Sequence, residues 1–261
     1  MIKVGITERG DAGLDFSWVS KLLDANIIIT KNLNDTMIQH LIDNKDKIIL
    51  HITCTGFGTT KIEPNVPNVK FTHRQVLNLI ENGFPVNQIV LRVDPIIPLK
   101  QVLEQRVKMV LDLFKDTGIK RVRYSFCDLY PHVKERLIKA GMNLPYETFC
   151  CPNYMKQDAL NLLKQYYDIY EFEACAENTF HQLGCISQKD FNILGIEGEA
   201  TPVGYQRKGC MCIAGKTELL TNKKKCFHGC LYCYWKDCSE KEKFKTKENA
   251  NDKLQTWLYK L

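Results

Sequence analysis

The fold is decided by the stretch Ile89-Val90-Leu91-Arg92-Val93-Asp94. Its β-branched and aliphatic residues are typical of a buried strand, and successive side chains of a strand point to opposite faces. Leu91 and Val93 therefore share one face, while Arg92 and Asp94 share the other. A strand in a doubly wound sheet is covered on both faces and is apolar throughout. One polar face instead favours a barrel with helices outside and a polar lumen inside.

Five more short apolar segments have this character, and a segment long enough for a helix follows each of the six. Strands that alternate with helices indicate βαβ units and a parallel sheet, here a wide, incompletely closed (β/α)6-type barrel of the α/β class. An antiparallel sheet with one wet face is the alternative, which the helix-length connections disfavour. The expected strands are Lys3–Thr7, Ile27–Thr30, Ile48–Thr53, Ile89–Val93, Val122–Phe126 and Tyr170–Ala174, and the expected helices are Phe16–Asp24, Asp35–Asn44, Thr72–Asn82, Val102–Thr117, Tyr130–Ala140 and Tyr154–Tyr167.

The same alternation predicts which side chains face the lumen. Function in such folds collects at the carboxyl ends of the strands, so polar residues there are candidates for binding and catalysis. We expect Arg92, Asp94 and Glu177 to bind the substrate, and Cys127, whose thiol has the lumen-facing parity, to be a hydrogen-atom donor. The residues expected on the polar faces are Thr7, Arg9 and Asp11 (opposite Val4 and Ile6), His51, Thr53 and Thr55, Arg123, Ser125 and Cys127, and Glu171, Glu173, Cys175 and Glu177.

Near its end the chain carries Cys226, Cys230 and Cys233 in a C-x3-C-x2-C pattern. Three thiolates at this spacing can hold three irons of a cuboidal [4Fe–4S] cluster and leave the fourth iron without a protein ligand. The pattern, with Tyr232 before the last cysteine, resembles the signature of the radical S-adenosylmethionine (SAM) superfamily. A zinc site that adds His228 or Cys238 as a fourth ligand is the alternative.

A second set of cysteines lies upstream. Cys210 and Cys212 form a C-x-C pair, and Cys175 and Cys185 flank the end of the sixth expected strand. Four thiolates would saturate a second [4Fe–4S] cluster or a zinc ion. A buried, unligated Cys175 is the simpler alternative.

The composition restricts the class of protein. No apolar run approaches the roughly 20 residues that span a bilayer, and Met1–Thr7 reads as a strand, so we expect a cytoplasmic protein without a membrane partner. Twelve cysteines in such a chain indicate metal or redox chemistry. Arg207–Lys260 holds 13 Lys and Arg against 6 Asp and Glu, and this basic end suits either a phosphate-bearing partner or a solvated tail.

Along most of its length the chain resembles the bacterial domain-of-unknown-function family eighteen-forty-eight, whose radical-SAM-type cysteine group is C-terminal. The family is similar in this motif to radical SAM enzymes, including the spore photoproduct lyase group. The matching stretches are Ile29–Asn32, Thr55–Pro64, Arg92–Ile96, Ser125–Tyr130, Cys175–Glu177, Cys185-Ile186, Gln206-Arg207, Cys210–Cys212 and Cys226–Tyr234.

The resemblance implies a circularly shifted radical SAM barrel. Residues 1–205 would form the partial barrel, and residues 206–261 a cysteine-rich segment that closes its mouth and ends in the basic tail. The N-terminal strand would then lie beside the cluster, with Arg9, Asp11 and Lys31 near SAM and Tyr232 against its adenine. The chain has no Gly-Gly-Glu motif, so the contact to the SAM amino group is assigned from position alone.

The expected function is that of a radical SAM enzyme, in which a 5′-deoxyadenosyl radical abstracts hydrogen from a substrate in the barrel. A reductant such as a flavodoxin or ferredoxin would supply the electron. A nucleic-acid base or nucleotide is one substrate class, favoured by the basic end. A small metabolite or peptide is the second, and a non-catalytic, zinc-stabilised binding protein is the third alternative.

Overall fold

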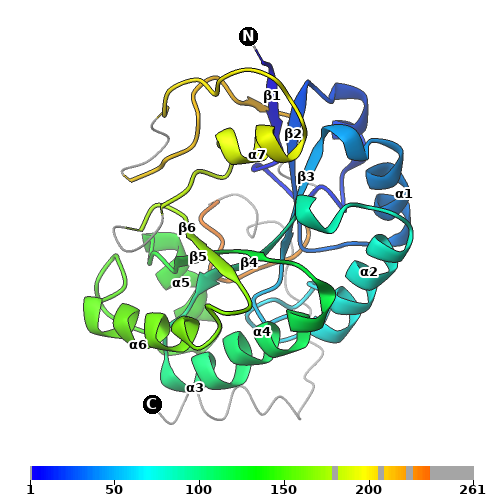
Figure 1. Cartoon of the computed structure of the whole chain (residues 1–261). Coiled ribbons are helices and arrows are strands. Elements are labelled where there is room, and N and C mark those ends of the chain that lie inside the picture. The colour runs from blue at the N-terminus through cyan, green and yellow to red at the C-terminus, as the bar shows by residue number, and fades with distance from the viewer. Residues whose placement is uncertain (1, 178–181, 205–208, 222–225, 236–261) are drawn as a thin grey trace.

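The computed structural model describes residues 2–177, 182–204, 209–221 and 226–235. They form a mixed α/β fold around a seven-stranded, entirely parallel sheet of order β6-β5-β4-β3-β2-β1-β7 (Figure 1). The sheet is not closed, because β6 and β7 are its two edges. The strands are β1 (Val4–Ile6), β2 (Ala25–Thr30), β3 (Ile48–Thr53), β4 (Ile89–Ile96), β5 (Arg121–Phe126), β6 (Glu171–Ala174) and β7 (Thr217–Glu218).

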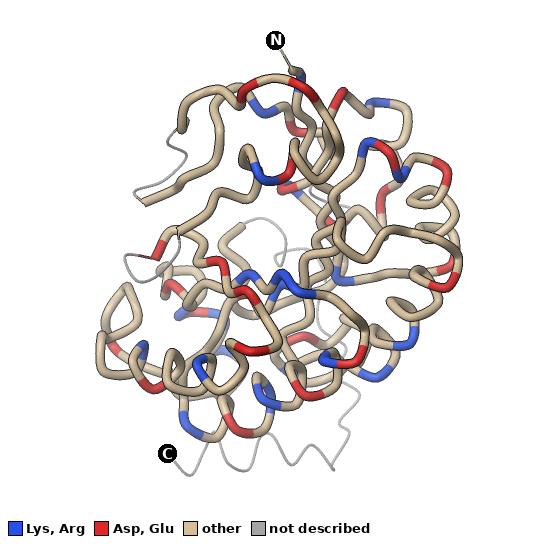
Figure 2. The backbone as a smooth tube through the Cα atoms, in the orientation of Figure 1, with Lys and Arg blue, Asp and Glu red and all other residues tan. Residues whose placement is uncertain are grey.

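Helices cover the outside of the curved sheet, with acidic and basic positions interspersed along them (Figures 1 and 2). Asn34 and Asn68 cap α1 and α2 by accepting hydrogen bonds from Met37 N and Phe71 N. All six predicted helices occur, the first as a 3₁₀ helix over Phe16–Lys21 and the fourth with a π-helical turn at Leu103–Val107. The bounds are α1 (Asp35–Asp43), α2 (Val69–Glu81), α3 (Lys100–Val102), α4 (Lys108–Phe114), α5 (Pro131–Lys139), α6 (Asn153–Lys164) and α7 (Gln188–Ile193).

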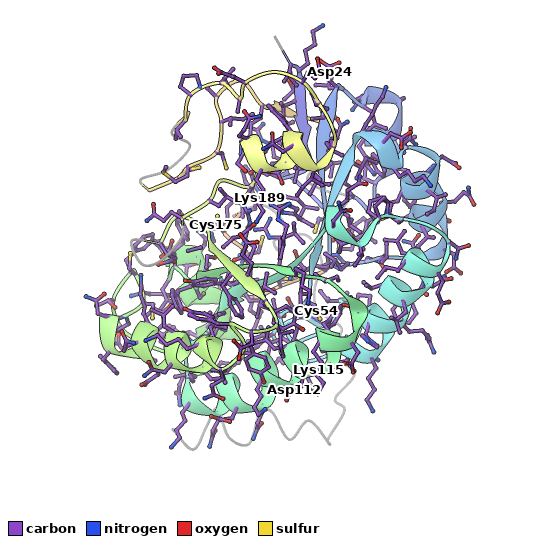
Figure 3. The ribbon with its side chains drawn as sticks, viewed as in Figure 1. Asp24, Cys54, Asp112, Lys115, Cys175 and Lys189 are labelled. Atoms are coloured by element: carbon purple, nitrogen blue, oxygen red, sulfur yellow. The ribbon has the colours of Figure 1, made fainter. Side chains whose placement is uncertain are left out.

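The inner face of the sheet is covered by α7, which the sequence pattern did not predict. In Figure 3, Lys189 of α7 and Cys175 after β6 both lie toward the middle of the molecule. Phe191 of α7 packs with Val4 and Ile6 in an inner apolar cluster, so these two β1 residues face inward. The predicted orientation of β1 is therefore wrong. The apolar face of a strand was expected to meet the outer helices. In β1 it faces inward instead, because its apolar partner lies on the inner side of the sheet.

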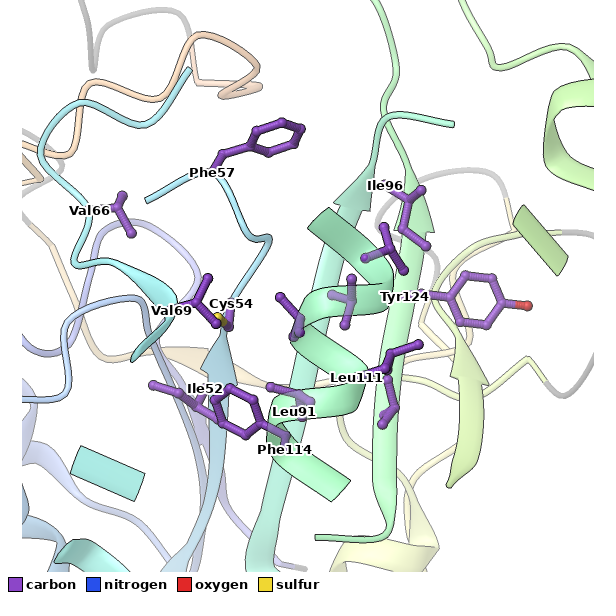
Figure 4. Packing of buried hydrophobic residues seen from close by; sticks show 14 of the residues in the cluster. Ile52, Cys54, Phe57, Val66, Val69, Leu91, Ile96, Leu111, Phe114 and Tyr124 are labelled. Carbon is purple, nitrogen blue, oxygen red and sulfur yellow. The ribbon is translucent and has the colours of Figure 1, made fainter. Parts of the chain in front are cut away.

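The outer core lies between the sheet and the helices. Ile52 of β3, Cys54 directly after it and Leu91 of β4 pack in one cluster with Leu111 and Phe114 of α4 (Figure 4). These positions alternate with His51 and Arg92, which point inward, as the two-residue period of β3 and β4 predicts. The predicted lumen orientation of Arg123 and Glu173 is likewise confirmed by their contacts with the segment around α7.

The C-terminal part of the chain extends the sheet. β7 pairs in parallel with β1, and Lys216 Nζ lies 2.7 Å from Glu8 Oε1 across this junction. The described part of residues 206–261 thus continues the sheet through β7, while the predicted boundary at 205 and the basic tail after Trp235 lie outside the described residues. Among the described helices, none has the length and apolar character needed to cross a membrane.

Candidate metal and cofactor site

Residues 226–235, here called the cysteine loop, lie against the segment that follows β3. Leu231 N donates to Ile62 O at 3.0 Å, and Asn65 N donates to His228 O at 3.3 Å. The Asn65 side chain donates a further hydrogen bond to Phe227 O at 2.7 Å. Because the segment after β3 starts at the carboxyl end of that strand, these contacts hold the cysteine loop at the rim where ligands of α/β folds bind.

Asp11 anchors the cysteine loop from the other side. Its Oδ2 lies 2.7 Å from His228 Nε2, and its Oδ1 accepts from Thr30 Oγ1 at 2.6 Å and Gly13 N at 2.8 Å. Burial opposes ionisation of Asp11, but the His228 charge and the hydrogen bonds outweigh it and lower its pKa. Asp11 therefore holds the loop in place, and its oxygens are already engaged where a SAM contact was predicted.

His228 is not available to a metal in this arrangement. Its Nδ1 lies 3.2 Å from Asn65 O, and its Nε2 faces Asp11. Burial disfavours the charged ring, yet Asp11 raises the pKa of His228 overall. Both ring nitrogens are thus directed at oxygen atoms, and the zinc site that uses His228 as fourth ligand stays an alternative. Cys238, the other predicted fourth ligand, lies outside the described residues.

A buried ion pair joins the cysteine loop to β2. Lys31 Nζ lies 2.8 Å from both Glu63 Oε1 and the Tyr232 hydroxyl, and Tyr232 donates to Glu63. Thr55 Oγ1 donates to the other Glu63 oxygen at 2.7 Å. Although burial opposes it, the Lys31 charge and these hydrogen bonds lower the pKa of Glu63. Tyr232, only 8% exposed, is thus bound within the protein, and its predicted contact with adenine stays a prediction.

The end of the cysteine loop is held by α5 and bordered by Arg9. Arg136 donates to the backbone oxygens of Cys233 and Trp235, the latter at 2.6 Å. The exposed Arg9 lies with its guanidinium carbon 5.9 Å from the centre of the Trp235 ring. Arg9 therefore stands at the rim with its charge accessible, which agrees with the predicted position beside the loop.

The three thiols of the cysteine loop fit an iron–sulfur cluster by their chemistry. Cys230 is buried, and Cys226 and Cys233 are half-buried. Burial and the nearby Asp11 raise the pKa of Cys226 to about 12, and burial and Glu63 raise that of Cys230. Within the described residues no group of three or more His, Cys, Asp or Glu side chains is placed so that it could hold a metal ion. Thiolates are the usual ligands of iron–sulfur clusters and of structural zinc, so the donor set by itself suits either group.

The predicted substrate residues divide into two groups. Arg92 pairs with Asp94, which also accepts from Ser125 Oγ, and all three belong to the inner face. Glu177 accepts from Phe126 N at 3.0 Å and pairs with Lys156 at 2.6 Å, so it ties β5 to α6.

Cys127 does not face the lumen. It lines a small outer cavity of about 20 Å³ together with Leu137 and Tyr232, and burial raises its pKa to about 12. The strand alternation fails here because β5 ends at Phe126 and its pairing with β4 shifts register between Val93 and Ile96. The lumen orientation predicted for Cys127 is therefore wrong.

Members of the second set of cysteines lie close together, while the predicted metal site there stays a prediction. Cys175 Sγ lies 3.9 Å from Cys185 Sγ, and Cys185 N donates to Cys212 Sγ at 3.1 Å. Cys212 also hydrogen-bonds with Cys210, which together with Cys185 and burial raises the pKa of the Cys212 thiol. Hydrogen bonds from Cys175 and Cys212 lower the pKa of Cys185. We call Cys175, Cys185, Cys210 and Cys212 the four-thiol group.

Arginines on the inner face hold the segment that carries Cys185. Arg123 donates to the backbone oxygens of Leu183 and Gly184, and it pairs with Glu173. Arg121 pairs with Glu173 at 2.9 Å and with Asp190 of α7 at 2.9 Å. Strand alternation predicts Arg123 and Glu173 on this face, but their partner could not be predicted, because the segment that meets them has no periodic pattern in the sequence.

A larger hollow of about 410 Å³ lies elsewhere. Tyr124, Tyr167 and Phe172 line it, together with Lys120 and Glu171 at the start of β5 and β6. These are the amino ends of the strands, opposite the cysteine loop. Its position therefore gives it no part in the site described above.

Replacing Gly13 by Ala is expected to loosen the Asp11 anchor. A Cβ at Gly13 would lie 1.9 Å from Asn32 O, so backbone must move, whereas one at Gly10 meets only the end of the Leu220 side chain at 3.2 Å. We expect Gly13→Ala to cost about 1–3 kcal/mol of unfolding free energy. Urea denaturation of both variants tests this, and equal stability of Gly13→Ala and Gly10→Ala would contradict it.

Comparison with known proteins agrees with the resemblance seen in the sequence. No curated protein matches the chain. The family described as Domain of unknown function (DUF1848) matches residues 15–235, a range that contains the six predicted helices, β2–β7, the four-thiol group and Cys226, Cys230 and Cys233. The chain belongs to this family.

Proposed function

We propose that this chain is a radical SAM enzyme whose barrel receives its cluster-binding loop from the C-terminal part of the sequence. One observation carries the proposal: the cysteine loop is fastened across the carboxyl ends of β1–β3 by Asp11, Lys31 and Glu63. Thiols that served only to stabilise a fold would not need to lie at this rim. In α/β barrels it is the edge where ligands and substrates bind.

Cys226, Cys230 and Cys233 would hold the [4Fe–4S] cluster. When bound, such a cluster with one open iron supplies the reductive cleavage of SAM and hence a radical that abstracts hydrogen. The chain's own residues provide position and charge. Arg9 offers an accessible cation to the SAM carboxylate, while Lys31 and Tyr232 hold the loop rigid through Glu63.

The substrate would approach from the carboxyl side of the sheet. The amino-terminal part of the inner face is occupied by α7 and by the buried pairs of Arg121 and Glu173. Arg92, Asp94 and Ser125, nearer the rim, are then the polar groups best placed to meet a substrate. A flavodoxin- or ferredoxin-like reductant would have to dock near the half-buried Cys226.

The substrate class is proposed as a nucleic-acid base or nucleotide, because of the basic composition of residues 207–260. Binding through phosphates should weaken steeply with salt. Fluorescence anisotropy with a labelled oligonucleotide at two salt concentrations tests this. Salt-independent binding or no binding would leave a small metabolite or peptide as the substrate class.

The Cys226→Ala variant is expected to lose its iron and its activity. Anaerobically purified wild type should contain about four irons per cysteine-loop site and release 5′-deoxyadenosine from SAM with dithionite. With two ligands left, Cys226→Ala should retain under a tenth of that iron and release no 5′-deoxyadenosine above background. The matched control is Cys150→Ala, since Cys150 is an exposed thiol outside both cysteine sets.

Two outcomes would contradict the proposed function. A wild type that carries zinc and no iron after anaerobic reconstitution with iron and sulfide would indicate a zinc-stabilised binding protein. Equal iron content in Cys226→Ala and Cys150→Ala would show that the cysteine loop does not bind the cluster.

A further inference from the structure

The four-thiol group lies where the sheet fails to close. Cys175 directly follows β6, one edge strand, and Cys212 precedes β7, the other edge strand. The isolated bridges Ala174↔Gln182 and Val203↔Ile213 flank the group on both sides. These thiols therefore lie between the two edge strands, which are not paired with each other in the described sheet.

The spacing of the sulfur atoms indicates the kind of metal. A tetrahedral ion with metal–sulfur bonds of about 2.3 Å places its sulfur ligands about 3.8 Å apart. The Sγ atoms of Cys175 and Cys185 are 3.9 Å apart. In a cuboidal cluster each thiolate binds a different iron, so its ligand sulfurs lie farther apart. The contact thus favours a single ion over a second iron–sulfur cluster.

The surroundings of the group also suit a bound metal. His51 is completely buried on the inner face of β3, its two ring nitrogens have no hydrogen-bond partner in the described part of the chain, and it interacts electrostatically with Cys185. Arg92 and Arg123 both interact with Cys175 and Cys185. A tetrathiolate zinc carries two negative charges, so buried donors and cations beside it would stabilise it.

We propose that Cys175, Cys185, Cys210 and Cys212 bind one zinc ion that fastens the two edges of the open sheet. The Sγ atoms of Cys175 and Cys185 are in contact, but within the described residues no group of three or more ligand side chains could hold a metal ion as placed, so binding requires the thiols to change rotamer. Each zinc–sulfur bond replaces an S–H bond, and the proton leaves to the buffer. No electron is transferred. With four protein ligands the site is closed and structural.

The experiment uses the full chain with Cys226, Cys230 and Cys233 all replaced by Ala, so it does not depend on the proposed function. This variant should bind one zinc per chain. With Co²⁺ it should show the visible ligand-field bands and the sulfur-to-cobalt charge-transfer bands of a tetrahedral thiolate site. Adding Cys212→Ala should weaken metal binding at least tenfold and abolish these bands, whereas adding Cys150→Ala should change neither.

Several results would overturn the proposal. They are no stoichiometric metal in the triple variant, bands that survive Cys212→Ala, a Cys175–Cys185 disulfide in reduced, anaerobic protein, or four irons with sulfide in the triple variant. If the Cys212 variant fails to fold, competition with a zinc chelator on the triple variant decides instead. Removal of zinc should lower the melting temperature by several degrees, and an unchanged melting temperature would refute the structural role.

Discussion

Replacing Glu173 by Ala is expected to lower the free energy of unfolding by about 3–5 kcal/mol, because it breaks a buried ion pair and leaves its partners charged. Glu173 pairs with Arg121 and Arg123, which are 4% and 0% exposed. Asp190 is the other carboxylate that pairs with Arg121. Arg123 also holds the backbone before Cys185, so the loss should extend to the inner cluster.

Thermal and urea denaturation measure this effect. For a chain of this length the melting temperature should fall by roughly 10 °C. The control is Glu171→Ala on the same strand, since the Glu171 side chain is 63% exposed and pairs with the same Lys189. An exposed pair contributes at most about 1 kcal/mol. Similar losses for both variants would show that the buried arginines do not depend on Glu173.

The second large effect is expected from Glu63→Gln, which removes the charge opposite Lys31 and the strongest acceptor for Tyr232. Stability should fall by about 3 kcal/mol, the cost of leaving one member of a buried pair alone. The cysteine loop depends on this contact, so local opening should expose Cys230, which is 7% exposed in the folded protein. Its reaction with a thiol reagent should accelerate about a hundredfold, since about 1.4 kcal/mol is a factor of ten.

Labelling followed by mass spectrometry locates the thiol that reacts. Glu81→Gln is the control, because Glu81 is exposed at the end of α2. The lowered pKa of Glu63 also predicts how the effect of Glu63→Gln depends on pH. A carboxylate whose pKa is lowered in the folded protein stabilises the fold at any pH above its ordinary pKa of about 4.3. This stabilisation is lost as the pH falls through the pKa of the carboxylate in the folded protein. The difference between wild type and Glu63→Gln should therefore shrink in acid, and a constant difference would contradict the argument.

The sheet and its outer helices were predictable from the sequence. Apolar residues recur with a period of two in strands and of 3.6 in helices when one face of the element is buried, and here the sheet and the outer helices bury their apolar faces against each other. β3 was predicted with its bounds, and the inward residues His51 and Arg92 followed from alternation. The inner layer was not predictable in the same way. The short α7 and β7 carry too few residues for a period, and β1 reversed its faces because an apolar segment fills the lumen.

The candidate site shows the same division. The spacing of Cys226, Cys230 and Cys233 is local, so these thiols could be grouped from the sequence alone. The anchors are not local: Asp11 meets His228 across 217 positions, and Tyr232 meets Glu63 across 169. A pattern in one sequence cannot report such pairs, so the contact of Asp11 with the cysteine loop was not predicted.

The late position of β7 in the chain has a consequence for biosynthesis. While the ribosome makes residues 7–216, the far side of β1 has no strand to pair with, although β2–β6 can already form beside it. An unpaired strand edge invites pairing with other chains. Nascent chains stalled before Thr217 should therefore aggregate or recruit chaperones more readily than chains stalled after Glu218.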